Sequence, residues 1–182
     1  MLGLGNSIVN STPTRALVLL GTYTSDFASG DDGWASFGTT GTVTITHNQS
    51  IGGRSGVLRV EYDTDETVLF GIQKSTPWGE DFKYGDIFDI QYSIYSEDNS
   101  PQDGSNLSHY FQAGSVFEAS RRVTESTPDL TWDDVVSEGN EITAATGDSS
   151  VMQIGFSSPS TAPGAGDFVY FDSIVVKHYR PS

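Results

Sequence analysis

The sequence predicts an all-β fold, a jelly-roll β-sandwich with an extended N-terminal arm. Glycine (20 residues), serine and threonine are abundant and no long helical period occurs, which favours strands and turns. Roughly eight to ten short strand-like segments follow one another with turn residues between them, a spacing typical of a sandwich or jelly roll. With 182 residues the chain is long enough for one domain with its own core, and we do not expect a second complete core.

Alternation of apolar and polar side chains places the individual strands. In residues 86–96, Phe88, Ile90, Tyr92 and Ile94 recur at every second position, so they share one face, which we take as the core face. By the same criterion and by the turn residues between them, the predicted strands cover residues 16–23, 40–47, 56–63, 67–72, 86–96, 109–118, 131–136, 148–156 and 167–179.

The last of these segments reads DFVYFDSIVVKHY and is apolar on both faces. The side chains expected on one side of the strand are those of Phe168, Tyr170, Asp172, Ile174 and Val176. A strand with two apolar faces is typical of a central strand with cover above and below. We therefore expect this segment in the middle of a sandwich sheet.

The N-terminal residues differ from the rest of the chain. Residues 1–14 are small, polar and rich in turn formers, so we expect residues 1–20 to form a docking arm and residues 21–182 to form the sandwich. No basic region precedes the first apolar residues, and the apolar run 16–20 is shorter than a signal peptide needs, so we expect the arm to be retained. The arm residues expected to contact a partner are Leu2, Leu4, Asn6, Ile8 and Val9.

Charge and cysteine content exclude several classes of function. Twenty-four acidic residues against nine basic ones give a formal net charge of −15, which disfavours nucleic acids and anionic membrane surfaces as partners. No apolar run approaches the roughly 18 residues needed to span a membrane. The absence of cysteine excludes disulfides and thiolate metal sites.

Asp172 is the one carboxylate within the apolar final segment. A buried carboxylate must be hydrogen-bonded, paired or bound to a metal ion, and the loop 25–34 (SDFASGDDGW) is the expected source of its partners. In one interpretation Asp172 joins Asp26, Asp31 and Asp32 in a structural calcium site, because calcium prefers carboxylate and carbonyl oxygens. In the other, Asp172 accepts hydrogen bonds from N–H groups of the loop and the other three are solvated. We predict no other cofactor.

Five aromatic residues outside the clearest core positions are candidates for glycan binding. A sugar ring stacks its apolar face on an aromatic ring while flanking polar groups hold its hydroxyls. The alternative is that the same rings fill the core or pin loops. The candidates are Trp34, Trp78, Tyr84, Tyr110 and Trp132.

Catalysis is not predicted. The three histidines, His47, His109 and His178, lie in different predicted strands or beside them, and no nucleophile elbow occurs. Carboxylates are numerous, but no segment places two of them in a recognisable acid and base setting. We therefore expect a protein that is not an enzyme.

Five segments in order resemble the landmarks of a family of carbohydrate-binding modules, the jelly-roll modules of the galactose-binding-like kind. They are SDFASGDDGWASF, GRSGVLRVEYD, STPWGEDFKYGDIFDIQYSIYSED, LTWDDVV and GDFVYFDSIVVKHY, and together they extend over about residues 23–179. The resemblance implies a β-sandwich that binds glycans. Ala28 stands where the family often has the glutamate of its early segment, a departure at the family's calcium site.

The arm carries a second resemblance. LGLGNSIV, residues 2–9, is similar to the start of structural proteins of tailed bacteriophages. This implies a virion protein, made in the host cytoplasm, that decorates the capsid or tail in many copies and docks through its arm on other virion proteins. Its sandwich would stabilise the shell or bind host-surface glycans weakly, with avidity replacing affinity. The alternative is a carbohydrate-binding module of a secreted polysaccharide-degrading system.

Overall fold

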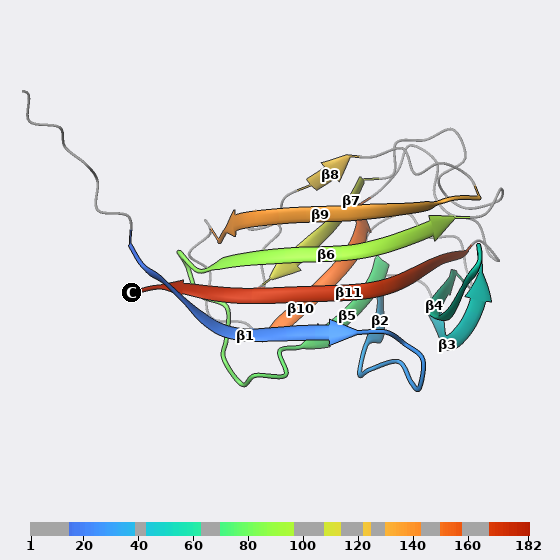
Figure 1. Cartoon of the computed structure of the whole chain (residues 1–182), viewed down its shortest axis with the longest axis horizontal. Coiled ribbons are helices and arrows are strands. Elements are labelled where there is room, and N and C mark those ends of the chain that lie inside the picture. Colours follow the sequence, from blue (N-terminus) through green and yellow to red (C-terminus); the bar gives the residue numbers. More distant parts are fainter. Residues whose placement is uncertain are drawn as a thin grey trace, which may run out of the picture.

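The structure, a computed structural model, describes residues 15–38, 43–62, 70–96, 108–113, 122–124, 130–142, 150–157 and 168–182. For the strands at 108–113 and 122–124 only the backbone is described. Every regular element in this part of the chain is a strand, and the strands form two packed antiparallel sheets (Figure 1). The predicted all-β jelly-roll sandwich is confirmed.

The first sheet is built around the last strand, β11 (Phe168–Pro181). Its order is β3-β4-β11-β6-β9, and β1 also pairs with β11. The bounds of the other strands are β1 Leu17–Ser25, β3 Val43–Ile51, β4 Arg54–Tyr62, β6 Ile87–Ser96 and β9 Trp132–Glu141. The final segment is therefore the central strand that its two apolar faces predict (Figure 1).

The second sheet lies behind the first and has the order β2-β5-β10-β7-β8. Its strands are β2 Ala35–Gly38, β5 Phe70–Ser75, β10 Val151–Ser157, β7 Ser108–Ala113 and β8 Arg122–Thr124. Strands β2 and β8 are absent from the sequence-based prediction, because four and three residues are too few to show an alternating pattern.

Apolar side chains from both sheets fill the space between them. Leu58, Phe171 and Val176 from the first sheet and Ile72 and Ile154 from the second are all fully buried in one cluster. Phe27 and Trp34, from the loop after β1, are buried in the same cluster and hold that loop against the core.

A bulge in β11 reverses the faces of the strand. The pairing with β6 shifts between Asp172 and Val175, and Ser173 has a positive φ of 55°. Phe171 before the bulge and Ile174 after it both face the main core. The sequence-based assignment of Tyr170 and Ile174 to one face is therefore wrong, because strict alternation cannot anticipate one extra residue.

A second apolar cluster covers the outer face of the first sheet beside this bulge. It contains Val57, Tyr95 and Tyr170, with Trp132 and Phe168 packed against them. The hairpin β3–β4 approaches it, since a side chain at Gly52 would collide with Trp132 and Tyr95. Cover on both faces of this part of β11 agrees with the prediction.

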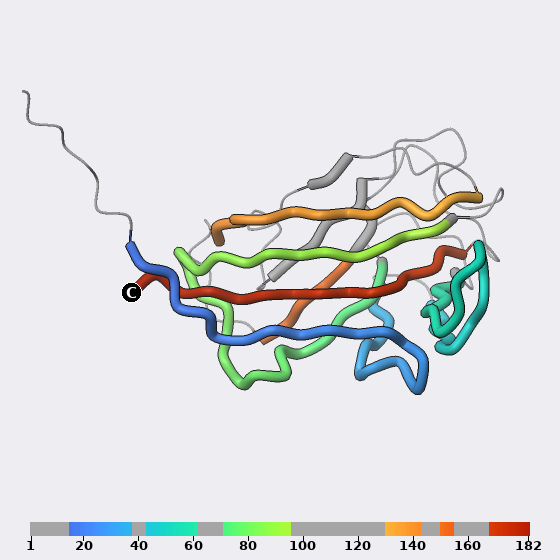
Figure 2. The backbone as a smooth tube through the Cα atoms, viewed as in Figure 1, coloured from blue at the N-terminus to red at the C-terminus, as the bar shows by residue number. Residues whose placement is uncertain are grey.

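The first and last described strands run side by side (Figure 2). Leu17 is paired with Pro181 and Ser25 with Ile174. Residues 17–20, at the end of the range expected for the arm, lie in the sheet. The predicted arm contacts Leu2, Leu4, Asn6, Ile8 and Val9 lie outside the described residues. Among the described residues there is no helix that could cross a membrane.

Candidate functional site

Three of the candidate aromatic rings are packed in different places. The side chain of Trp34 is 1% exposed and its ring lies edge-on to Tyr23, so no ring face remains for a ligand. Trp78 is half-buried and its Nε1 donates a hydrogen bond to His178. Trp132 lies in the second cluster under the guanidinium of Arg54, which is 4.4 Å from the ring centre. These three rings do not form one platform.

The other two candidate rings belong to Tyr84, whose side chain is described, and Tyr110, for which only the backbone is described. Tyr84 is 66% exposed and lies in the connection between β5 and β6. Tyr110 is in β7 as the backbone partner of Gly155, and its side chain lies outside the described residues. Tyr84 and Tyr110 therefore remain candidate ligand residues.

The aspartates of the loop 26–34 hold that loop together. Asp32 accepts hydrogen bonds through Oδ2 from Ser25 Oγ and from the backbone N–H groups of Asp26 and Phe27. Asp26 and Asp31 each accept one bond from a backbone N–H two residues later. Such bonds are the turn-forming role of aspartate. Each of these three carboxylates therefore has a structural role within its own loop.

Asp172 pairs with an arginine, not with this loop. Its Oδ2 is 3.0 Å from Nη1 of Arg54, at the start of β4, and Nη2 of Arg54 is 3.6 Å from Asp134. The expected link between Asp172 and the loop is therefore corrected, because a cation from the β3–β4 hairpin compensates the half-buried carboxylate. The described residues contain no group of three or more acidic or histidine side chains that could hold a metal ion. Structural calcium remains a prediction.

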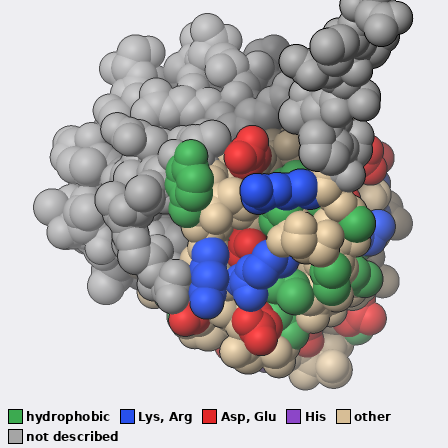
Figure 3. All heavy atoms as spheres, turned by 90° about the vertical axis from the view of Figure 1, so that its left-hand side faces the viewer, with side chains coloured by type: hydrophobic (Ala, Val, Ile, Leu, Met, Phe, Trp, Pro, Cys, Tyr) green, Lys and Arg blue, Asp and Glu red, His purple; other side chains and the backbone are tan. Residues whose placement is uncertain are grey.

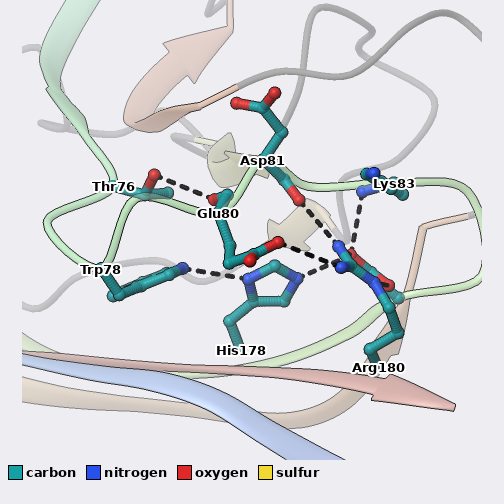
Figure 4. Close-up of polar contacts among 8 residues, drawn as sticks. Thr76, Trp78, Glu80, Asp81, Lys83, His178 and Arg180 are labelled. Carbon is teal, nitrogen blue, oxygen red and sulfur yellow. Dashed lines mark hydrogen bonds and ion pairs between the residues drawn. The ribbon is translucent and has the colours of Figure 1, made fainter. Parts of the chain in front are cut away.

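The end of the sandwich where β1 begins and β11 ends carries basic, acidic and apolar side chains close together (Figure 3). Behind that surface lies a buried polar network (Figure 4). Asp86 accepts two hydrogen bonds of 2.9 Å from the guanidinium of Arg180, one of 2.9 Å from the backbone N–H of Lys83 and one of 2.7 Å from His178. Arg180 also binds Glu80. The network fixes the β5–β6 connection to β11.

The tautomer of His178 follows from its two partners. An indole N–H can only donate, so the bond of 3.1 Å from Trp78 requires Nδ1 of His178 to accept. Nε2 then carries the proton and donates a hydrogen bond to Asp86. Both nitrogens of a fully buried ring are occupied, so His178 and Asp86 are not placed to exchange a proton with a substrate.

Burial and hydrogen bonding shift the pKa values of this pair. Burial lowers the pKa of His178 below its usual 6.5, and this outweighs the opposite effect of Asp86. Burial alone would raise the pKa of Asp86, but the bonds from Arg180, His178 and the Lys83 N–H hold it below its usual value. The fold therefore favours neutral His178 beside ionised Asp86.

On the outer face of the second sheet, identical residues of β5 and β10 lie opposite one another. The tripeptides Gly71-Ile72-Gln73 of β5 and Gln153-Ile154-Gly155 of β10 are paired so that like residues lie opposite one another. The isoleucines face the core, which places the glycines and the glutamines on the opposite face. Gln153 Nε2 donates a hydrogen bond of 3.0 Å to Gln73 Oε1 across the strands.

The neighbouring strands extend these two rows. In β2, Phe37 pairs with Gly71 and Ala35 with Gln73. In β7, the backbone of Tyr110 pairs with Gly155 and that of Gln112 with Gln153. One row thus has two glycines between positions held by Phe37 and Tyr110, and the next row carries amides. From β2 to β7 the rows extend about 14 Å, three strand spacings.

Sequence reasoning missed this face, although a signal was present. GIQ and QIG are mirror images in sequence, and an antiparallel pair of such segments brings identical residues together. The pairing of β5 with β10 was the missing information, because about 80 residues separate Gln73 from Gln153.

The sequence matches no protein-family model and is similar to no curated protein. Solved structures, in contrast, share the fold. The xylan-binding CBM22-1 domain of Xyn10C from Paenibacillus barcinonensis has a TM-score of 0.51 and 17% identity, over 92% of this chain and 99% of that domain. A family 11 module from Clostridium thermocellum, in complex with a mixed-linked tetrasaccharide, has a TM-score of 0.52 and 18% identity, over 86% of this chain and 95% of that module. The chain thus has the jelly-roll fold of carbohydrate-binding modules.

Two enzymes contain the same fold. An arabinose-bound α-L-arabinofuranosidase has a TM-score of 0.54 and 15% identity over 80% of this chain, but the chain spans only 23% of that protein. The Stig cyclase Fisc from Fischerella sp. TAU has a TM-score of 0.55 and 10% identity over 92% of this chain and 100% of the cyclase. At such identities the likeness concerns the fold alone. The bacteriophage interpretation of residues 2–9 finds no support in these comparisons.

Proposed function

We propose that this chain is a non-catalytic module that binds a neutral polysaccharide chain on the outer face of its second sheet. The observation that carries the proposal is the paired register of GIQ and QIG, which sets a glycine row beside an amide row. Amides both donate and accept hydrogen bonds, as sugar hydroxyls require, and they lie beside the glycine row, in which Gly71 is itself buried.

The amide row has hydrogen-bonding capacity left for a ligand. Gln153 Nε2 donates to Gln73 Oε1. The other two polar atoms of the pair, Gln153 Oε1 and Gln73 Nε2, have no partner among the described residues. Both side chains are half-buried and hold each other in place. A bound hydroxyl would therefore meet one fixed donor and one fixed acceptor.

Aromatic positions lie at both ends of the glycine row. Phe37 is half-buried at the edge strand, and Tyr110 occupies the opposite end of the row. Aromatic rings bind the apolar faces of pyranoses. Modules of the same fold that bind xylan or a mixed-linked tetrasaccharide support β-linked glycans as the ligand class.

This proposal favours a module of a secreted polysaccharide-degrading system over a decoration protein of a virion. The fold comparisons include glycan-binding modules, whereas the virion role rests on residues outside the described part of the chain. A non-catalytic role agrees with the buried state of the Asp86–His178 pair.

Binding of xylan and mixed-linked β-glucan oligosaccharides by isothermal titration calorimetry tests the proposal. Gln153→Ala should weaken binding about 5-fold, the effect of one hydrogen bond of about 1 kcal/mol. Phe37→Ala should weaken it roughly 2- to 10-fold through lost stacking.

The matched control is Gln91→Ala, which removes an exposed glutamine of β6 in the other sheet. It should bind like the unaltered protein. Equal affinity of Gln153→Ala, Phe37→Ala and Gln91→Ala, or no binding of any β-linked glycan by the unaltered protein, would overturn the proposal.

A further inference from the structure

The geometry points to the free edge of strand β1 as a surface that pairs with β1 of a second copy of this chain, which would join the first sheets of two molecules into one. β1 lies at an edge of the first sheet, with β11 on one side (Figure 1). On its other side, no backbone hydrogen bond links residues 17–25 to any described strand or loop. Such an edge offers unpaired N–H and C=O groups to another strand. This inference does not rest on the proposed glycan face.

The other described edges of the two sheets are poor surfaces for pairing. β9, at the opposite edge of the first sheet, carries four acidic residues in WDDVVSEGNE, and β3 has two shifts in its register with β4. β2 and β8, at the edges of the second sheet, have only four and three residues. Charge, irregular register and shortness are means by which proteins prevent pairing at sheet edges. β1, in contrast, has nine residues, LVLLGTYTS, with no charge, no proline and a single register shift.

Three consecutive apolar side chains of β1 are exposed. Leu17, Val18 and Leu19 are 48%, 50% and 52% exposed. Successive residues of a strand point to opposite faces, so a partner strand along this edge would cover apolar side chains on both faces of the sheet. The strand is also held in position, because Trp78 packs so closely against Gly21 that a Cβ atom there has no room. An edge that is already formed costs less to order when a partner binds.

The charges at the two ends of β1 favour a second copy as the partner. Arg15 lies two residues before β1 begins and Asp26 one residue after it ends, and both side chains are exposed. Neither forms an ion pair with a described residue. When two identical strands pair antiparallel about a two-fold axis, each strand starts beside the end of the other, so Arg15 of each copy approaches Asp26 of the other. These two contacts offset part of the repulsion between chains of net charge −15.

The mass of the full chain in solution is the first test, measured by sedimentation equilibrium. We expect a reversible dimer of twice 19.6 kDa, with a dissociation constant in the micromolar range. Leu19→Glu sets two like charges near the two-fold axis and should weaken the dimer at least about 10-fold. The matched control is Val136→Glu, because Val136 is an apolar residue of β9, 60% exposed, at the opposite edge of the same sheet. It should leave the dissociation constant unchanged.

Charge reversal tests the two-fold arrangement. Arg15→Glu should weaken the dimer roughly 5-fold, since exposed ion pairs contribute little. The double variant Arg15→Glu/Asp26→Lys exchanges the two charges and should restore the affinity. Asp26→Lys also removes the hydrogen bond to the N–H of Ala28, so the thermal midpoint is measured beside the affinity. A double variant with the thermal midpoint of the unaltered protein and no restored affinity would rule out this arrangement.

Distances between spin labels locate the interface. The chain has no cysteine, so Thr22→Cys or Val136→Cys carries one label per copy. Thr22 is an exposed residue of β1, so its labels in the two copies should lie within about 20 Å of each other. From β9 the order runs through β6 and β11 to β1, so the Val136 labels should be seven strand spacings apart, or roughly 34 Å.

Three results would overturn the inference. They are a monomer at every concentration, a dimer that Leu19→Glu does not weaken, and a dimer in which the Val136 labels lie closer together than the Thr22 labels. A monomer that binds a strand of another protein along β1 contradicts the inference equally. The side chains of Leu19, Thr22 and Val136 are exposed, so we expect their variants to fold like the unaltered protein.

Discussion

The outer face of the second sheet and the network at the end of the sandwich use polar groups in opposite ways. On the sheet face, Gln73 and Gln153 are half-buried, bind each other and keep hydrogen-bonding capacity for a ligand. In the network, Asp86 and His178 are almost completely buried and every hydrogen-bonding position of His178 is occupied. Polar groups that are saturated stabilise the fold, whereas groups that are held in place but unsaturated can still form a hydrogen bond with a ligand.

The largest expected effect on stability is loss of the central carboxylate of the network. Asp86→Ala leaves Arg180 and His178 without their partner in a buried site, which should cost about 3–5 kcal/mol of unfolding free energy. Urea denaturation followed by tryptophan fluorescence measures it. The control is Glu80→Gln, because Glu80 is the half-exposed partner of Arg180 and should cost about 1 kcal/mol or less. Equal costs would show that the network is not cooperative.

A pair of tryptophan substitutions isolates one hydrogen bond of the network. Trp78 donates to His178, whereas Nε1 of Trp132 is buried without a partner in the described part of the chain. Trp78→Phe and Trp132→Phe remove the same number of atoms, but only the first leaves a buried acceptor unpaired. We expect Trp78→Phe to cost about 1–3 kcal/mol more. The same loss in both variants would mean that the bond adds no net stability.

Stability should fall as the solution is acidified. The pKa of His178 is lowered in the fold, so below about pH 6.5 the unfolded chain takes up a proton that the folded chain resists. The folded state therefore loses stability as pH falls from about 6.5 to the lower pKa of folded His178. The lowered pKa of Asp86 adds a further loss below about pH 3.8. Denaturation midpoints measured against pH should show the first loss in the unaltered protein and not in His178→Gln.

The smallest expected effect concerns Asp172. Its partner Arg54 is one-third exposed, so Asp172→Asn should cost about 0–1 kcal/mol. A chelator should then leave the thermal midpoint unchanged in both proteins. A clear drop with chelator in the unaltered protein alone would instead support the calcium site that the sequence suggested.

The class of fold and the central place of β11 could be predicted from the sequence, because hydrophobic patterns over long strands record which faces are buried. The bulge at Ser173 could not, since one inserted residue leaves the composition of the strand unchanged. The short strands β2 and β8 carry too little pattern to detect.

The candidate site was harder to predict than the fold. Trp34 was a reasonable choice by residue type, but exposure depends on packing between distant segments, and the structure buries it. The glycine and glutamine rows depend on the pairing of β5 with β10, which local pattern cannot supply. Arg54 as the partner of Asp172 is likewise a contact between residues 118 positions apart.

The central claim is that the outer face of the second sheet binds a neutral β-linked glycan. The most direct measurement is an NMR titration of the ¹⁵N-labelled protein with a xylo-oligosaccharide. We expect the largest shifts at the backbone amides of Gly71 and Gly155 and at the side-chain amides of Gln73 and Gln153. Shifts confined to the first sheet, or no shifts with any β-linked oligosaccharide, would contradict the claim.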